Sequence, residues 1–531
     1  DESFSDVQTA ELMNRLFINV KVDKDARPDV DSLYQQALRH FGGQGGWPAT
    51  LFLTPDSKPF FAGTYFPAVA KESSANTYSK DAQSQHTHLS FRDVLWQVAG
   101  MWRQDAAGAY KASAQAGESM QGLSASRPGA QTMPTEKIDE LVEGLISRVD
   151  PDKGGFGQGG KFHHVPVLAL MWQRACAKNH QDNPGDHAGG VPGGDAPADA
   201  PAHSPASSSG RRKRLLAASV RLTLDNMCQG GIFDHAGGGF FRSTTDRAWQ
   251  NPLPEKTLTD NAQMLALLTT VWQETKNPLY KDRAEKTARW LVEEMQLTAS
   301  EGGQANKAGF ATSMTSHMGK NEKVLAEANG LAIAALTHAG AVFARPDWRT
   351  AAEQAFYAVI ATHSNEDGGL YHSWDAGTLY KENPGKVSPG NVSVSEDYAA
   401  MAHAALTLYE TRQAGNKQEL LEKAQMWLYR LMQHHEDTQK GGFYHTEKHN
   451  NDLFIALKNS RDGATPSANG LAMQGAARLF HLTASRVWQE QAKRIFGAFS
   501  GDIPGDVFCH AGLLLGQSYL LDYSLSPDDN S

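Results

Sequence analysis

The sequence has few cysteines and no long apolar run. Its 531 residues contain three cysteines, Cys176, Cys228 and Cys509, which lie far apart and form no Cys-x-x-Cys pair. Such a composition provides no disulfide framework and is typical of a reducing compartment, so a cytoplasmic location is expected. No stretch of about 18 consecutive apolar residues occurs. A membrane-spanning helix is therefore not expected.

Basic clusters are also scarce. The formal net charge is −9, and the densest basic run is Arg211–Arg214, beside a predicted linker. Nucleic acids and anionic membranes are bound through extended basic surfaces, so neither partner is expected. The pair His163-His164 has no third residue at a recognised metal-ligand spacing, and we expect neither a metal nor another cofactor. The sequence gives no indication of an oligomeric state.

A Gly-Gly pair recurs five times after residue 150, at intervals of 66 to 76 residues. A period of this length corresponds to one supersecondary unit that packs on its neighbours. A helix start is predicted about 26 to 30 residues after each of the last four pairs. The pairs begin at Gly154, Gly230, Gly302, Gly368 and Gly441, and the helix starts lie at Asp260–Asn261, Asn329–Gly330, Glu396–Asp397 and Ser467–Asn469. We therefore predict about six helical hairpins that close into a toroid, with the long loops gathered at one rim.

Residues 1–68 have a different pattern, in which short strand-like runs surround one helix. The predicted elements are a strand at Ile18–Val22, a helix from Pro28 to about Leu38, a strand at Trp47–Leu53 and a strand at Pro59–Tyr65. This order corresponds to the second half of an α/β sandwich, and the first βα unit is missing. One amphipathic helix over 91–117 then leads to the repeats, which start near Pro134.

Two polar segments interrupt this organisation. Residues 179–210 are rich in glycine, proline and alanine, and Val191 is their only large aliphatic residue. They contain too little apolar surface to offset the entropy of ordering, so we predict a disordered insertion within the first hairpin. A smaller polar insertion is predicted over 72–90.

The predicted rim is rich in acids, histidines and aromatic residues. Acid–base chemistry on a sugar needs two carboxylates, or a carboxylate and a histidine, with aromatic rings on which the sugar stacks. We therefore predict a site for a small sugar or sugar-like ligand. Helix capping and core packing explain several of the same residues equally well. The catalytic candidates are Asp234, His235, Glu255, Asp397 and Asp462, and the substrate-binding candidates are Phe233, Lys256, Asp260, Asn261, Trp374 and Tyr398.

Several motifs are similar to those of one family. The segments Phe17–Asp23, Gly43–Pro48, Gly63–Pro67, Gly230–Phe240, Ser395–Tyr398 and Asp462–Ser467 resemble the thioredoxin-domain family of spermatogenesis-associated protein 20. The resemblance covers nearly the whole chain apart from the two insertions. It implies a mainly α fold with an incomplete thioredoxin-like domain at 1–120 and an (α/α)6 barrel at 134–525, similar to six-hairpin glycosidases and N-acylglucosamine epimerases. Pro48 then corresponds to the cis-proline that faces a thioredoxin active site.

The chain departs from this family at three places. The family has a Cys-x-x-Cys pair just before the segment matching Glu2–Phe4, and here that pair and its strand are absent, which we interpret as an incomplete gene model or a truncated chain. The family's His-Phe-Glu-Lys reads Leu253–Lys256, and its Trp-Asn-Gly reads Ala328–Gly330. Three functions therefore stay open. They are a sugar-binding or sugar-modifying barrel, a thiol redox protein in a longer parent chain, and a non-catalytic binding or regulatory protein.

Overall fold

The structure is a computed structural model that divides into two compact units. It describes residues 3–43, 45–68, 89–123, 126–177, 208–301, 304–375, 393–412, 415–448 and 452–522. Unit 1 contains Asp1–Ser126, Pro389–Val394 and Tyr444–Asn459, and unit 2 contains Arg127–Ser388, Ser395–Phe443 and Ser460–Ser531. Within the described ranges, no helix combines the length and the apolar character needed to cross a membrane.

Unit 1 contains four helices and one hairpin among its described residues. They are α1 (Val7–Leu16), α2 (Pro28–His40), α3 (Phe91–Gln104), α4 (Ala106–Leu123) and the antiparallel strands β1 (Thr50–Leu53) and β2 (Pro59–Gly63). Pro28 occupies the first turn of α2, where its fixed φ suits the helix and its missing N–H costs nothing. The predicted helix and hairpin are thus confirmed, and the Trp47–Pro48 peptide bond is cis, as expected.

Two expectations for unit 1 are wrong. Residues 18–22 form no strand, and the side chains of Ile18 and Val20 are 96% and 80% exposed. In the described part of unit 1 the sheet consists of β1 and β2 alone, and this segment pairs with neither strand. The single helix expected over 91–117 is broken at Asp105, which ends α3 and accepts a hydrogen bond of 2.8 Å from Gly108 N at the start of α4.

A segment from the second half of the chain belongs to unit 1. We call Tyr444–Asn459 the arm. Its residues Ile455 and Leu457 join Leu33 of α2 in one buried cluster, and Tyr34 of the same helix contacts Phe454. The sequence did not predict this, because the arm lies between two repeats and carries no pattern that links it to residues more than 400 positions away.

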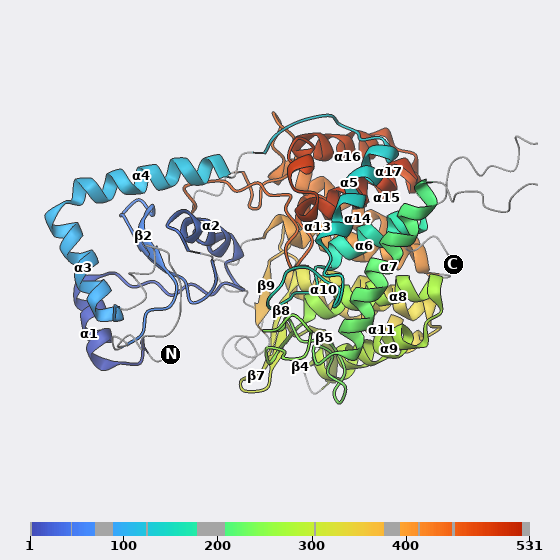
Figure 1. The fold of residues 1–531 in the computed structure, drawn as a ribbon, viewed down its shortest axis with the longest axis horizontal. Coiled ribbons are helices and arrows are strands. Elements are labelled where there is room, and N and C mark those ends of the chain that lie inside the picture. Colours follow the sequence, from blue (N-terminus) through green and yellow to red (C-terminus); the bar gives the residue numbers. More distant parts are fainter. Residues whose placement is uncertain are drawn as a thin grey trace, which may run out of the picture. The chain divides into compact units, whose positions relative to one another are not determined.

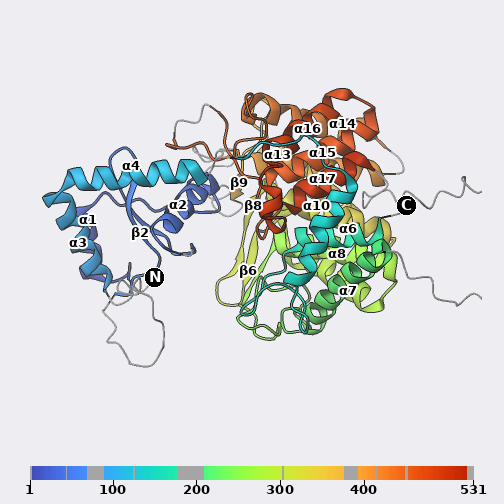
Figure 2. The ribbon, with the colours of Figure 1, turned by 45° about the horizontal axis from the view of Figure 1, so that its top comes forward.

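Six helices form a closed inner ring in unit 2, each packed against the next and the last packed against the first. They are α6 (Val165–Cys176), α8 (Leu258–Thr275), α10 (Ala326–Val342), α13 (Ser395–Thr411), α15 (Ala468–Thr483) and α17 (Ala511–Leu521). An outer layer of helices alternates with them in sequence and covers them (Figures 1 and 2). These are α5 (Thr135–Glu143), α7 (Ser208–Gln229), α9 (Pro278–Trp290), α11 (Pro346–His363), α14 (Lys417–Arg430) and α16 (Arg486–Phe499). The predicted (α/α)6 barrel is confirmed.

Sequence composition separates the two layers. The inner helices α10 and α17 are buried along almost their whole length, whereas the outer helix α16 buries only one face, which includes Trp488 and Ile495. A helix that is apolar all round belongs in a core, and an amphipathic helix covers one.

The two predicted insertions lie mostly outside the described part of the chain, which omits residues 179–207 of the first and 72–88 of the second. The last residues of the first insertion, Ser209 and Gly210, belong to the first turn of α7.

The long loops gather at one rim, as expected. Turns of only two or three residues connect α8 to α9, α10 to α11 and α15 to α16, while each return from an outer to an inner helix takes a long excursion. Several of these excursions contain short strands. They are β3 (Glu255–Thr257), β4 (Gln296–Glu301), β5 (Gln304–Phe310), β6 (Ser313–Thr315), β7 (Gly319–Asn321), β8 (Lys323–Leu325) and β9 (Ser373–Asp375). The rim therefore lies at the N-termini of the inner helices.

Candidate functional site

Asparagine side chains fasten the rim loops to the inner helices. Asn261 of α8 accepts a hydrogen bond of 2.6 Å from Phe240 N and donates one of 2.9 Å to Phe240 O. The same pair of bonds joins Asn329 to Phe310 and Asn469 to Phe443. Because the amide of Asn261 also donates to Thr257 O, its polar atoms are occupied by backbone. This geometry gives the predicted substrate-binding Asn261 a structural role.

Asp234 and Lys256 form an ion pair that closes a rim turn. Lys256 Nζ lies 2.6 Å from Asp234 Oδ2 and 2.8 Å from Gly238 O. Asp234 Oδ1 also accepts hydrogen bonds from the N–H groups of Ala236 and Gly237. Burial acts to raise the pKa of Asp234, but the Gly237 N–H and the Lys256 ammonium outweigh it and lower that pKa. Both candidates are therefore engaged with the protein itself.

His235 and Glu255 lie near this turn and are also paired. One ring nitrogen of His235 is 3.0 Å from Gly230 O, and the Glu255 carboxylate forms a 3.0 Å ion pair with Arg242. Phe233 is 1% exposed and stacks edge-on against Phe240 inside the core. Its ring fills space and offers no open platform.

The other candidates are distributed around the ring of inner helices. Asp397 is buried and lies 2.8 Å from His372 Nδ1. Asp462 accepts hydrogen bonds from Ser467 N and Gly512 N, and burial raises its pKa to about 6. The buried side chains of Tyr398 and Trp374 belong to α13 and β9, and the Tyr398 hydroxyl accepts a hydrogen bond from Leu370 N. Asp260, in the first turn of α8, is also buried.

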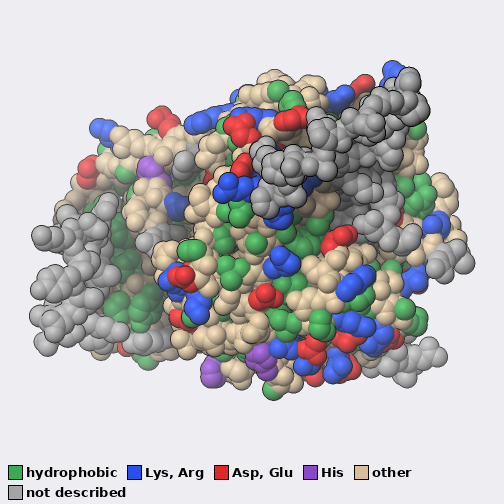
Figure 3. Space-filling view, turned by 45° about the vertical axis from the view of Figure 1, so that its right-hand side comes forward, with side chains coloured by type: hydrophobic (Ala, Val, Ile, Leu, Met, Phe, Trp, Pro, Cys, Tyr) green, Lys and Arg blue, Asp and Glu red, His purple; other side chains and the backbone are tan. Residues whose placement is uncertain are grey.

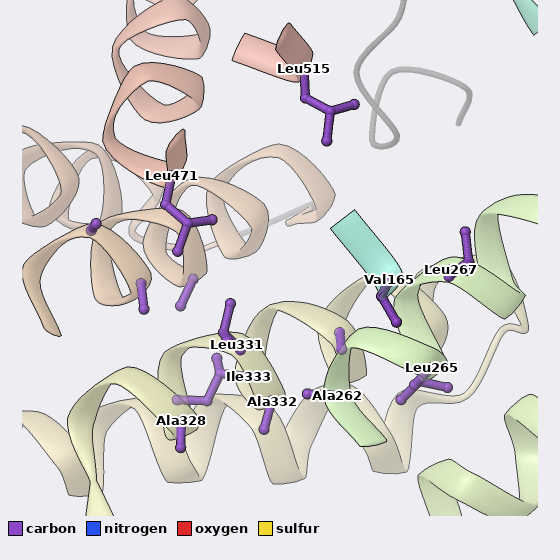
Figure 4. Close-up of a cluster of buried hydrophobic side chains, with 14 of the residues drawn as sticks. Val165, Ala262, Leu265, Leu267, Ala328, Leu331, Ala332, Ile333, Leu471 and Leu515 are labelled. Carbon is purple, nitrogen blue, oxygen red and sulfur yellow. The ribbon is translucent and has the colours of Figure 1, made fainter. Parts of the chain in front are cut away.

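A cavity of about 500 Å³ lies along the axis of the barrel, enclosed by all six inner helices. We call it the axial cavity. None of the candidates from the sequence is among the residues that line it. Leu331, Leu471 and Leu515 extend into this space from three different helices (Figure 4). Cys176 and Glu274 line the cavity and are exposed, so it opens at the C-terminal ends of α6 and α8, away from the rim.

One charged group in the cavity wall is already neutralised. Arg478 of α15 is 2% exposed, and its guanidinium forms hydrogen bonds of 2.5 and 3.1 Å with the Glu410 carboxylate. It also donates to the Thr407 hydroxyl and approaches His403 Nδ1 at 3.0 Å. Because arginine can only donate, His403 Nδ1 is the acceptor in this bond. The wall is thus polar without a net charge at this point.

Three other side chains of the wall have polar atoms without a hydrogen-bond partner, although Gln263 Nε2 donates to Thr259 O and Ala464 O. Both amide atoms of Gln173, Oε1 of Gln263 and Nε1 of Trp172 are buried and make no hydrogen bond within the described residues. A buried polar group without a partner costs about 1–3 kcal/mol, so each of these three side chains calls for a physical explanation. Sequence reasoning missed these residues because Gln and Trp on an apolar helix face carry no recognisable motif.

Comparison with known proteins agrees with the resemblance seen in the sequence. Residues 1–121 match the family described as Thioredox_DsbH, a protein of unknown function (DUF255). The chain is 23% identical to spermatogenesis-associated protein 20 of Rattus norvegicus, over 94% of the chain and 71% of that protein. The resemblance to the spermatogenesis-associated protein 20 family is confirmed. The human member of this family is likewise 23% identical over 94% of the chain and 71% of its own length.

Solved structures similar to the chain include two proteins named for sugar chemistry. A sugar epimerase from a ruminal bacterium is 11% identical, covers 69% of the chain and 86% of its own length, and has a TM-score of 0.48. A D-mannose isomerase is 12% identical, covers 75% of the chain and 100% of its own length, and has a TM-score of 0.49. Similarity at this level does not identify the ligand or the reaction of this chain.

Proposed function

We propose that unit 2 binds a neutral, hydroxyl-rich small molecule of the carbohydrate class in the axial cavity. The observation that carries this proposal is the set of unpartnered polar atoms on Gln173, Gln263 and Trp172. Together they offer hydrogen-bond donors and acceptors without a formal charge. A hydroxyl group both donates and accepts, and it is also neutral, so a polyhydroxylated ligand satisfies all three side chains.

The size and electrostatics of the cavity support the same ligand class. A volume of about 500 Å³ lies within the range of about 300–1,000 Å³ that is usual for small-molecule sites. Arg478 is balanced by Glu410 at hydrogen-bond distance, so the wall requires no anionic ligand. The apolar side chains of Leu331, Leu471 and Leu515 complete a mixed surface of the kind that suits the apolar faces of a sugar ring.

We further propose that the protein resides in the cytoplasm and binds no nucleic acid. All three cysteines are free, which supports a reducing compartment such as the cytoplasm. On the face shown in Figure 3, acidic and basic side chains lie interspersed, which supports the absence of a nucleic-acid partner. The sequence of unit 1 contains no cysteine, so thiol chemistry beside Pro48 requires a cysteine from outside unit 1.

A ligand screen with one matched pair of variants tests the proposal. D-glucose, D-mannose, N-acetyl-D-glucosamine and cellobiose are titrated against the full chain by calorimetry. Gln173→Leu removes an unpartnered amide, and Gln418→Leu makes the same change at an exposed position of α14. We expect Gln173→Leu to weaken sugar binding at least tenfold without lowering the melting temperature, and Gln418→Leu to leave binding unchanged. Absence of binding for all four sugars, or equal affinity of both variants, contradicts the proposal.

A further inference from the structure

We propose that His163 and Asp260 form a site for one hydroxyl oxygen at the rim end of the axial cavity. This inference rests on the proposed function, because the oxygen belongs to a hydroxyl group of the bound sugar. In the absence of the sugar, a water molecule takes its place. The site fixes which end of the ligand points toward the rim.

The distance between the two side chains defines the gap. His163 Nδ1 lies 3.9 Å from Asp260 Oδ1, which is too far for a direct hydrogen bond. One oxygen atom placed between them reaches both at ordinary hydrogen-bond distances of about 2.8 Å. His163 is 3% exposed, and neither of its ring nitrogens has a hydrogen-bond partner in the described part of the chain. Such an imidazole calls for a polar atom that the protein itself does not provide.

Asp260 presents one oxygen to this gap. Its Oδ2 is held by the Thr257 hydroxyl at 2.5 Å, and its backbone N–H donates to the same hydroxyl oxygen, as in a helix cap. Within the described residues no hydrogen bond reaches Oδ1. Capping therefore accounts for the position of Oδ2 and leaves Oδ1 facing His163.

The two residues of the gap lie two and three positions from residues that line the axial cavity. Asp260 precedes Gln263 by one turn of α8, and His163 precedes Val165, the first residue of α6, by two positions. Gln263 and Val165 both line the cavity. Residues three apart on a helix share a face, so Asp260 continues the Gln263 side of the wall toward the rim. A ligand that satisfies Gln263 Oε1 thus has a neighbouring group within reach of this gap.

The protonation states suit a hydroxyl group. Burial lowers the pKa of His163 to about 3, and the nearby His164 lowers it further. Burial raises the pKa of Asp260 to about 6, against opposing contributions from Thr257 and Arg242. At neutral pH the pair is therefore a neutral imidazole and a carboxylate. A hydroxyl group donates its proton to the carboxylate and accepts the imidazole N–H, which satisfies His163 Nδ1 and Asp260 Oδ1.

A crystal structure of the ligand-free chain provides the first test. We expect an ordered oxygen atom within hydrogen-bond distance of both His163 Nδ1 and Asp260 Oδ1. An empty gap, or a ring that has moved to contact Asp260 directly, overturns the proposal. This result does not depend on any sugar, so it remains decisive if the ligand screen fails and the proposed function falls.

Binding of deoxy sugars to two variants provides the second test. D-glucose is compared with its 2-, 3-, 4- and 6-deoxy analogues on the wild-type chain, on His163→Phe and on the control His317→Phe, which changes an exposed histidine. We expect one analogue to bind the wild type and the control at least tenfold more weakly than glucose. In His163→Phe only the bond to Asp260 remains, so we expect a clearly smaller difference between glucose and that analogue. Unchanged discrimination by His163→Phe, or equal binding of all analogues by the wild type, overturns the proposal, whereas loss of sugar binding in Gln173→Leu alone still supports the proposed function.

Discussion

His372 Nδ1 lies 2.8 Å from Asp397 Oδ1, and both side chains are buried. Asp397 also accepts a hydrogen bond of 3.1 Å from Glu327 N, at the start of α10. The pair thereby links the loop before α13 to the neighbouring inner helix. A carboxylate placed in this way is a structural anchor, although its residue type and position at a helix start made it a catalytic candidate in the sequence.

The stability of unit 2 should depend on pH through this pair. Burial acts to lower the pKa of His372, but the charge and hydrogen bond of Asp397 outweigh it and raise that pKa to about 9, from 6.5. The stabilisation is complete below pH 6.5 and is lost as the pH rises through 9. We expect His372→Gln to cost on the order of 2 kcal/mol at pH 6 and little at pH 10. Urea unfolding of both proteins at several pH values measures this difference, and a constant difference between them would contradict the assignment.

The three asparagines that hold the rim loops, Asn261, Asn329 and Asn469, should contribute to stability and not to ligand binding. Asn261→Ala leaves Phe240 N and Phe240 O buried without partners, which costs about 2–4 kcal/mol for the two groups. Chemical denaturation measures the loss, and Asn14→Ala, at an exposed position of α1, serves as the control with no change expected. A stable Asn261→Ala variant with weakened sugar binding would contradict this prediction and show that Asn261 contributes to ligand binding.

Asp234 should also be a structural residue. Asp234→Ala leaves the Lys256 ammonium, whose side chain is 9% exposed, without its anion, and we expect a loss of about 2 kcal/mol. Lys256→Met in the same chain removes the stranded charge and should restore part of that stability. Thermal unfolding of the two single variants and the double variant measures the coupling. Simple additivity of the two losses would show that the pair is not coupled.

Modification of Cys176 should close the axial cavity. Cys176 is exposed as a residue and lines the cavity, whereas Cys228 is fully buried. Burial of its sulfur raises the pKa of Cys176 to about 12, so reaction with N-ethylmaleimide should be slow and should accelerate with pH. In a Cys509→Ser background, mass spectrometry follows the adduct and calorimetry follows sugar binding. We expect modification to abolish binding and bound sugar to slow modification; unaltered binding by the modified chain would place the ligand elsewhere.

The arrangement of helices followed closely from the sequence. The Gly-Gly period marked each repeat, and the apolar spacing after Asp260 and Asp397 placed inner helices at α8 and α13. These signals are local, because a helix face or a glycine turn is encoded by residues within a few positions of one another. Closure of the ring followed from the same repeat, since each hairpin needs a neighbour on which to bury its apolar face.

The candidate site was not predictable in the same way. Asp234, Asn261 and Asp462 have the residue types of a sugar site, yet each is satisfied by backbone or by a partner within the barrel. Gln173 and Trp172 carry no such signal, and only the folded barrel shows that they are buried beside a cavity without partners.

The sequence by itself determined the repeat, the helix starts and the family resemblance, because these depend on short-range patterns. The tertiary structure alone decided which polar groups are satisfied, since hydrogen-bond partners such as Asp462 and Gly512 come from distant parts of the chain. It also decided that the arm packs in unit 1 and that residues 18–22 form no strand, because both outcomes depend on which neighbours are present. Local sequence propensity favours a helix or a strand, and burial against a neighbouring element determines whether it forms.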